Sequence, residues 1–397
     1  MAIKNRIAEF HNEMTAWRRD IHAHPETEFE EFRTADLVAA KLGSFAIEVH
    51  RGLAKTGVVG VLAAGTSGRK IGLRADMDAL HVRELNQFRH RSQNDGKMHA
   101  CGHDGHTAML LGAAKYLAET RRFDGTVYFI FQPAEENEAG GRVMIEDGLF
   151  EQFPAEAVYG MHNMPGIAVG KIALMPGAMM ASADFFQIEV TGVGAHGAFP
   201  HFGIDPVLIG AEIITALQRI VSRSTDPMKS VVVSATQFHA GDTGNVIPER
   251  AVISGTARTF QEPLQDMVER SIRQIAAGIA AAHGAEVQVT YERRYPATVN
   301  TPAETERAAK SAARVVGPEN VLRDLAPIMG SEDFGWMLKE RPGCYIWIGN
   351  GTEKGGCHVH NPNYDFNDEI LTIGASYWAT LAEDLLPARA AAAASVG

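Results

Sequence analysis

Apolar and polar positions recur with two different periods along this chain, and these periods predict its elements. Near the start, apolar residues recur at steps of three and four, the spacing of one helical face: Ile3, Ile7, Phe10, Met14, Trp17 and Ile21. Short β-rich runs then predict strands at 58–64, 70–76, 126–132, 157–162 and 344–351, with helical or loop-like stretches such as 104–119 between them. This alternation predicts an α/β fold with a mixed, partly parallel sheet flanked by helices.

The pattern changes from Asp184 onward. It predicts, in order, a strand at 184–193, a helix near 205–224, strands at 230–240 and 250–258, a helix at 262–283 and a strand at 286–294. This βαββαβ order is that of a ferredoxin-like unit, which folds by itself and can be inserted into another domain. We therefore predict a catalytic domain at 1–183 and 298–397 and an inserted domain at 184–297. The tail ARAAAAASVG is predicted to fray.

Length and charge agree with two domains and narrow the range of partners. A chain of 397 residues exceeds what one hydrophobic core usually supports. Its 37 Lys and Arg against 48 Asp and Glu give a net charge of −11, which disfavours nucleic acid or an anionic membrane as the main partner. The first 20 residues lack the apolar stretch of a signal peptide, and no apolar run approaches the roughly 20 residues of a membrane span. These features predict a cytoplasmic protein.

Polar side chains that could bind a metal or transfer protons follow several predicted strands. In open α/β sheets, ligands gather at the carboxyl ends of strands. The residues at such positions are Asp76, Asp78, Glu135, Glu136 and His162. An isolated pair such as Glu135 and Glu136 is more often a solvated loop than a functional one. Two adjacent carboxylates at a strand end can also divide labour, one binding a metal and the other moving protons.

The segment HACGHDGH (99–106) gathers a thiol, imidazoles and a carboxylate just before a helix-like run. A single free cysteine or histidine is most often a core or surface residue. A cluster of such residues is instead more often functional, because a thiolate together with imidazoles suits zinc. Added carboxylates in a dinuclear arrangement would also admit manganese, cobalt or nickel. The three cysteines, Cys101, Cys344 and Cys357, cannot form a paired disulfide framework, so at least one is available for such a use.

GVGAHG (192–197) satisfies the dinucleotide fingerprint, but Pro200 and Pro206 interrupt the region where the phosphate-binding helix would begin. A nucleotide site is therefore rejected, and the sequence also lacks a nucleophile elbow, a P-loop and an HExxH pair.

Cys101 as a thiol nucleophile stays conceivable, with His162 or His360 as its base. The flanking His103 and Asp104 fit a metal site better.

Taken together, the motifs resemble the aminoacylase-like branch of the dinuclear metallopeptidase superfamily, which comprises hippurate hydrolases, N-acyl amino acid amidohydrolases and auxin-conjugate hydrolases. The motifs that carry the resemblance span nearly the whole chain: RRDIHAHPE (18–26), LRADMDAL (73–80), MHACGHDGHTAMLLGAA (98–114), FQPAEENEAGG (131–141), MHNMPG (161–166), GAHGAFPH (194–201), NVIPE (245–249), GSEDFG (330–335) and HNPNYDFND (360–368). One departure is His81, where the family commonly has proline, followed by a basic stretch.

The resemblance implies roles for particular residues. It implies two divalent metal ions per subunit, manganese or zinc before cobalt or nickel, held by Cys101, His103, Glu136, His162 and His360. Glu135 would be the general base, and Asp78 would orient a ligand or the base. The inserted domain would act as a lid and carry dimerisation. There His196 would reach the partner subunit's active site and polarise the substrate carbonyl, and Asn245 would help to hold the substrate.

The expected activity is metal-dependent hydrolysis of the amide bond of N-acyl amino acids, by a homodimer or a dimer of dimers. On the same fold, the alternatives are an N-acetyl-diaminopimelate deacetylase, an N-carbamoyl-amino-acid hydrolase and a small dipeptidase. From other classes, the alternatives are a metal-independent cysteine hydrolase and a non-catalytic binding protein.

Overall fold

The computed structural model describes residues 1–388, so most of the tail predicted to fray lies outside the described residues. Contacts divide the chain into two compact units. Unit 1 comprises Met1–Met179, Val299–Ala326 and the chain from Asp333 onward, and unit 2 comprises Met180–Thr298 and Pro327–Glu332. Independent folding of an inserted domain at 184–297 stays a prediction. Within residues 1–388, no helix is long and apolar enough to cross a membrane.

Unit 1 contains an eight-stranded sheet. Its four central strands, β4, β3, β5 and β16, run parallel, whereas β1, β2 and the contact between β16 and β6 add antiparallel pairs. The predicted mixed, partly parallel sheet is thus confirmed. In spatial order the strands are β1 (Glu48–Arg51), β2 (Val58–Ala64), β4 (Gly125–Gln132), β3 (Lys70–Asp76), β5 (Ala157–Pro165), β16 (Gly343–Gly351), β6 (Ile172–Ala173) and β15 (Val321–Leu322).

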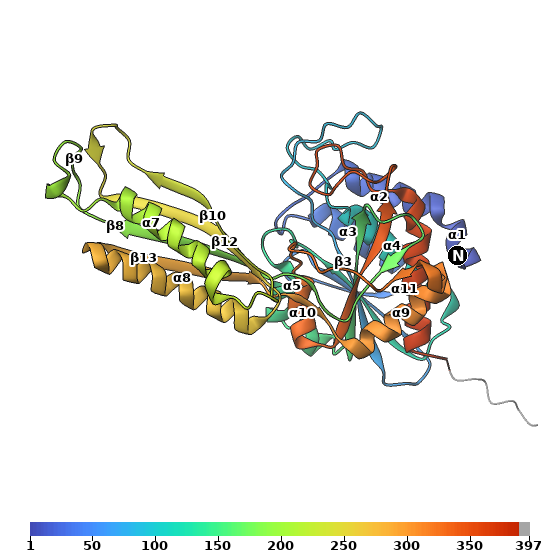
Figure 1. The fold of residues 1–397 in the computed structure, drawn as a ribbon. Helices are drawn as coiled ribbons and strands as arrows, with labels where there is room; N and C mark the ends of the chain where they lie inside the picture. The colour runs from blue at the N-terminus through green and yellow to red at the C-terminus, as the bar shows by residue number, and fades with distance from the viewer. Residues whose placement is uncertain (389–397) are drawn as a thin grey trace, which may run out of the picture. The chain divides into compact units, whose positions relative to one another are not determined.

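Helices flank this sheet (Figure 1). They are α1 (Asn5–Glu9), α2 (His11–Ala23), α3 (Phe32–Ser44), α4 (His103–Thr120), α5 (Gly140–Glu146), α6 (Leu149–Gln152), α9 (Pro302–Val316), α10 (Phe334–Glu340) and α11 (Leu371–Leu385). Because both faces of the sheet are covered, the central strands are continuous buried runs, and all nine residues of β16 are buried. The amphipathic stripe near the start is buried from Ile7 to Ile21, although the helix is divided at Phe10 into α1 and α2.

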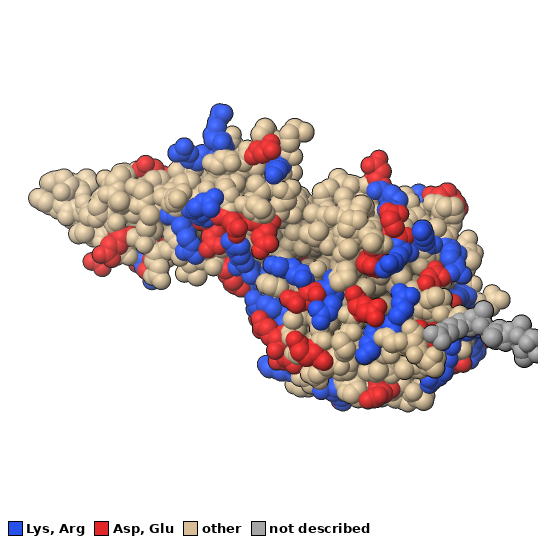
Figure 2. Space-filling view, turned by 90° about the horizontal axis from the view of Figure 1, so that it is seen from below, with Lys and Arg blue, Asp and Glu red and all other residues tan. Residues whose placement is uncertain are grey.

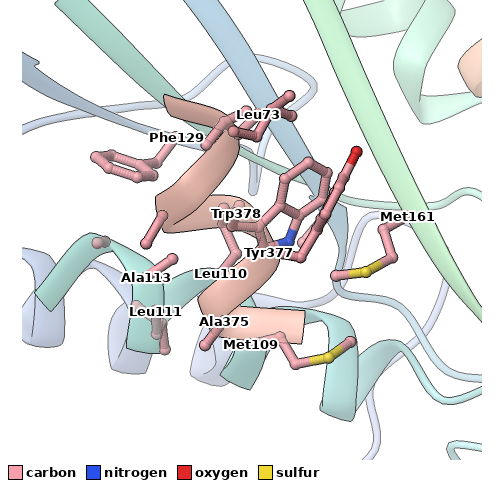
Figure 3. Close-up of a cluster of buried hydrophobic side chains, with 14 of the residues drawn as sticks. Leu73, Met109, Leu110, Leu111, Ala113, Phe129, Met161, Ala375, Tyr377 and Trp378 are labelled. Carbon is pink, nitrogen blue, oxygen red and sulfur yellow. The ribbon is translucent and has the colours of Figure 1, made fainter. Parts of the chain in front are cut away.

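The core of unit 1 lies between the sheet and its helices. Leu110 of α4 and Trp378 of α11 meet Leu73 and Phe129 of the central strands, and all four side chains are fully buried (Figure 3). Helix α4 is buried along most of its length, so packing fixes its axis. The residues at the N-terminus of α4 are therefore held firmly.

Unit 2 has the element order βαββαβ, which the sequence predicted. The elements are β8 (Ala183–Thr191), α7 (Pro206–Arg219), β10 (Val231–Ala240), β12 (Arg250–Thr259), α8 (Glu262–His283) and β13 (Glu286–Tyr295). The strands form an antiparallel sheet in the order β10-β12-β8-β13, and α7 and α8 cover one face of it (Figure 1). Buried residues alternate along β12, as expected for a sheet with one covered face. A short ribbon pairs β9 (Ala195–His196) with β11 (Val246–Ile247).

Candidate metal centre

The parallel strands of unit 1 bring separate parts of the chain to one edge of the sheet. Asp76, the last residue of β3, pairs in register with Gln132, the last residue of β4, and His162 of β5 pairs with Trp347 of β16. Since the carboxyl ends of parallel strands meet at the same edge, the residues that follow these strands converge there.

Five of the residues selected from the sequence lie together at this edge. The Sγ of Cys101 lies 3.2 Å from Nε2 of His162, and Oε1 of Glu136 lies 3.3 Å from Nε2 of His360 and 3.8 Å from Nε2 of His103. Ligands about 2.0–2.3 Å from a tetrahedral ion lie roughly 3.3–3.8 Å apart, so these separations are close to those of ligands that share a cation.

The donor atoms form two overlapping groups. Those of Cys101, His103 and His162 all lie within 4.8 Å of one another, and so do those of Cys101, Glu136 and His360. Because Cys101 belongs to both groups, its thiolate is placed where it could contact two ions. The arrangement therefore fits a dinuclear centre of thiolate, imidazole and carboxylate ligands.

The His103 side chain gives a direct sign that a cation fits here. Its Nε2 atom is buried and has no hydrogen-bond partner among residues 1–388. Burial alone would lower the pKa of His103, but the carboxylates of Asp76 and Asp78 outweigh burial and raise that pKa to about 10. A buried site with this excess of negative charge favours a bound cation over a solvent-free void.

The turn before α4 explains how Cys101 and His103 come to face the same point. Gly102 between them has a φ of 96°, a left-handed conformation that favours glycine. A Cβ atom at this position would lie 2.5 Å from Nδ2 of Asn163 and 2.6 Å from the hydroxyl oxygen of Tyr364. The tight turn therefore requires glycine, and α4 begins directly at His103.

Hydrogen bonds orient the candidate ligands. Asp78 accepts a hydrogen bond from Nδ1 of His103 at 3.0 Å through one oxygen, and from the backbone N–H of Glu136 at 3.0 Å through the other. The Nδ1 atom of His162 lies 2.6 Å from the carbonyl oxygen of Asn163, so donation there leaves Nε2 directed at Cys101. Asp78 thus contacts two candidate ligands at once.

Glu135 lies next to this cluster and is only 6% exposed. Its Oε1 atom accepts a hydrogen bond of 3.2 Å from the backbone N–H of Asp333. The preceding residue, Ala134, has a φ of 51° and donates its N–H to Glu31. Burial, followed by the nearby charge of Asp78, raises the pKa of Glu31 to about 7. The loop that carries Glu135 is therefore held by two hydrogen bonds, one from Ala134 to Glu31 and one from Asp333 to Glu135.

Asp76, which the sequence also selected, lies behind the donor cluster. One of its oxygens accepts a hydrogen bond from Arg74 and the other is 2.6 Å from Nδ1 of His106, whose Nε2 accepts from the backbone N–H of Asn163. Burial would raise the pKa of Asp76, but the charges of His103 and Arg74 and the contact with His106 hold it well below its usual range. Asp76 thus belongs to a layer of buried polar side chains behind the donor atoms, which also contains Arg74, His106, Asn163 and Asp333.

Sequence reasoning missed the rest of this layer. It assigned no role to Arg74, Asn163 or Asp333, although all three lie inside motifs that carried the family resemblance. The only sequence feature that could have indicated a role for them was their position within the motifs RAD, MHNMPG and GSEDFG.

The environment of Cys101 bears on the alternative of a metal-free cysteine hydrolase. Burial, followed by the charges of Glu136 and Glu135, raises the pKa of the Cys101 thiol well above its usual range. A cysteine nucleophile needs a lowered pKa, because the thiolate is the reactive form. These surroundings therefore favour a metal-ligand role over that of a free nucleophile.

The remaining two residues selected from the sequence lie together in unit 2. His196 of β9 pairs in register with Val246 of β11, and the adjacent Gly197 donates its N–H to the carbonyl of Asn245 at 2.8 Å. His196 is exposed, and its Nδ1 accepts a hydrogen bond from Ala198. The roles of His196 and Asn245 toward a substrate stay predictions.

Comparisons with known proteins agree with the motifs. The model of peptidase family M20/M25/M40 matches residues 72–384. The chain is 43% identical to a hippurate hydrolase of Campylobacter jejuni, over 95% of this chain and 97% of that protein. It is 39% identical to an N-acetylcysteine deacetylase of Bacillus subtilis, over 94% and 97% respectively. Among solved structures, the YXEP protein of Bacillus subtilis, described as a dinuclear metal-binding peptidase, is 36% identical with a TM-score of 0.84, over 96% of this chain and 99% of that one. The resemblance inferred from the motifs is confirmed.

Proposed function

This chain belongs to peptidase family M20/M25/M40, and we propose that it is a metal-dependent amidohydrolase that cleaves the amide bond of N-acyl amino acids. The observation that carries the proposal is the convergence of thiolate, imidazole and carboxylate donors beside a buried glutamate. Two of the relatives named above are a hippurate hydrolase and an N-acetylcysteine deacetylase, whose substrates share an acyl group on an amino acid.

The proposed ligands of two divalent cations are Cys101, His103, Glu136, His162 and His360. The donor set suits manganese or zinc, and also admits cobalt or nickel. Cations held there would supply Lewis acidity and lower the pKa of water. Asp78, which contacts two of these ligands, would hold them in position.

Glu135 is the proposed general base and acid. Its carboxylate takes a proton from the water that attacks the amide carbonyl carbon, and later gives that proton to the nitrogen as the C–N bond breaks. The products are a carboxylic acid and a free amino acid, so the proton count balances. The backbone N–H of Asp333 donates a hydrogen bond to Oε1 of Glu135 and so restrains this carboxylate, which supports the proposal.

The direct test replaces Glu135 with glutamine, which keeps the shape and removes the base. With metal content unchanged, we expect turnover of N-benzoyl, N-acetyl and N-lauroyl amino acids to fall by about 10²- to 10⁴-fold. Glu138→Gln, on the exposed part of the same loop, is the matched control and should keep full turnover. Near-normal turnover of Glu135→Gln would contradict the assignment.

Chelation separates this proposal from its alternatives. Protein stripped of metal and re-supplied separately with manganese and zinc should lose and then regain activity. Activity that resists chelation would instead move the nucleophile to Cys101. Tight metal binding without turnover across the panel would favour a binding protein.

We also propose that the protein acts as a homodimer through unit 2. The segments around β9 and β11 and the first turn of α7 expose large apolar side chains at Val193, Phe199, Phe202, Leu208 and Val246. The end of unit 2 that carries β9 shows few charged side chains (Figure 2). Contiguous exposed apolar residues on a monomer are typical of an interaction surface. His196 lies among them, so dimerisation could present it to the partner subunit.

Subunit mixing tests that composite site. His196→Ala and Glu135→Gln homodimers should each be nearly inactive, because one lacks the oxyanion donor and the other the base. After verified subunit exchange, hybrid dimers contain one intact site and should regain partial activity. Absence of any recovery would count against a contribution of His196 in trans.

A further inference from the structure

Asp333 makes an unusual set of contacts for a residue at the start of a helix. It occupies the N-cap position of α10, where an aspartate ordinarily accepts hydrogen bonds from the first turn. Its side chain makes no such capping bond. It is instead fully buried, and its two oxygens accept hydrogen bonds from Arg74, Gln132 and the backbone of Gly141. The carboxylate therefore serves something other than helix capping.

The partners of Asp333 are themselves rigidly held. Arg74 is buried on β3 and donates to Asp333 at 2.9 Å, to Gln132 at 2.8 Å and to Asp76 at 2.6 Å. Gln132 donates to both oxygens of Asp333, at 2.9 and 2.8 Å. A cation and an amide from two neighbouring strands thus clamp one carboxylate, and the hydrogen bond from Arg74 is charge-assisted.

The clamp matters because the backbone of the same residue contacts Glu135. The N–H of Asp333 donates to Oε1 of Glu135 at 3.2 Å. Fixing the Asp333 side chain fixes the direction of this N–H, which in turn restrains the carboxylate of Glu135. A base beside several imidazoles and a cation site would otherwise have competing orientations available.

We propose that Asp333, clamped by Arg74 and Gln132, is a positioning residue for Glu135. This inference rests on the proposed function, because it presupposes that Glu135 moves the proton. In this role Asp333 acts on turnover through the orientation of one carboxylate, that of Glu135. A misplacement of about 1 Å in a reacting group can cost about 100-fold in rate.

The test is a double-mutant cycle with Asp333→Asn and Glu135→Gln. Arg74, Gln132 and Gly141 all donate hydrogen bonds to the Asp333 carboxylate, so an asparagine amide turns one of these bonds into a clash of two donors. We expect Asp333→Asn alone to lower kcat about 10- to 100-fold, with KM and metal affinity, measured by chelator competition, within about twofold of the wild type. In the Glu135→Gln background, Asp333→Asn should lower the residual kcat by less than about twofold, because its target is already lost.

Additive losses in the cycle, or an unchanged kcat for Asp333→Asn, would overturn the proposal. An unchanged kcat for Glu135→Gln would overturn the proposed base itself, so the two failures are distinguishable. Tyr159→Phe is the control for destabilisation, since it removes a buried hydrogen bond with Glu304 elsewhere in unit 1 and should leave kcat unchanged. If Asp333→Asn fails to fold, Gln132→Met removes part of the clamp without a charge change and is put through the same cycle.

Discussion

Asp78→Asn should weaken metal binding while leaving the fold intact. The substitution keeps the size of the side chain but removes its charge. One oxygen can still accept from Nδ1 of His103, as a neutral and weaker acceptor. The other becomes an amide nitrogen that faces the backbone N–H of Glu136, so a donor meets a donor.

The size of the effect follows from those two contacts. Loss of groups that orient metal ligands typically costs 10- to 100-fold in metal affinity, or about 1.4–2.7 kcal/mol. That range agrees with the roughly 1.5–3 kcal/mol attributed to hydrogen bonds with a charged partner. We therefore expect the dissociation constant for manganese or zinc to rise by 10- to 100-fold in Asp78→Asn.

Competition with a chromophoric chelator at neutral pH measures this constant without any substrate. Asp36→Asn is the matched control, because Asp36 is an exposed carboxylate of unit 1 that pairs with Arg51. A dissociation constant for Asp78→Asn within threefold of the wild type, like that of the control, would refute the reasoning. The assignment of Asp78 as an orienting residue would then have to be abandoned.

Two further predictions concern stability. Gly102→Ala forces alanine to a φ of 96° and places Cβ 2.5 Å from Nδ2 of Asn163, so we expect thermal unfolding to show a loss of at least about 2 kcal/mol, whereas Gly68→Ala, with no atom within 4 Å of its Cβ, should be neutral. Burial would lower the pKa of His22, but its bonds to Asp104 and a second carboxylate raise it to about 9. A folded-state pKa above the usual 6.5 adds stability that is complete below pH 6.5 and is lost as the pH rises towards 9. His22 should therefore contribute about 3 kcal/mol to the stability that metal-free protein loses across that window. Urea unfolding measures this contribution as the difference between the wild-type loss and the loss of His22→Gln.

The fold was predictable where burial imposes a period on the sequence. The runs at 58–64 and 70–76 coincide with β2 and β3, because burial within the sheet favours consecutive apolar positions; Arg74 and Asp76 are the buried exceptions in β3. Helix α8 was likewise predicted at 262–283, since it buries one face against the sheet of unit 2. Two-residue strands such as β6 and β9 carry too few residues to show any period, and they were missed.

The candidate site was predictable for a different reason. Parallel strands deliver their carboxyl ends to one edge, so Asp78, Glu135 and His162 could be grouped before any coordinates were known. HACGHDGH added Cys101 and His103 because thiolate and imidazole side chains rarely cluster without a metal. The role of His360 as a metal ligand came from the family resemblance alone, because nothing in its local sequence marks it as a ligand.

The buried polar layer behind the donor atoms could not be predicted from strand ends or local motifs, for a physical reason. Arg74 and Asp333 are 259 residues apart in sequence, and their contact depends on side-chain direction inside a closed core. In a local reading, Arg74 is a charged interruption of a strand and Asp333 is an ordinary N-cap. Only the three-dimensional contacts show that the buried Arg74 donates to Asp333, and that Asp333 makes no capping bond to α10. Local sequence rules thus fail at Arg74 and Asp333, the residues that we propose hold Glu135 in place. At these positions a contact between residues distant in sequence replaces the locally preferred structure.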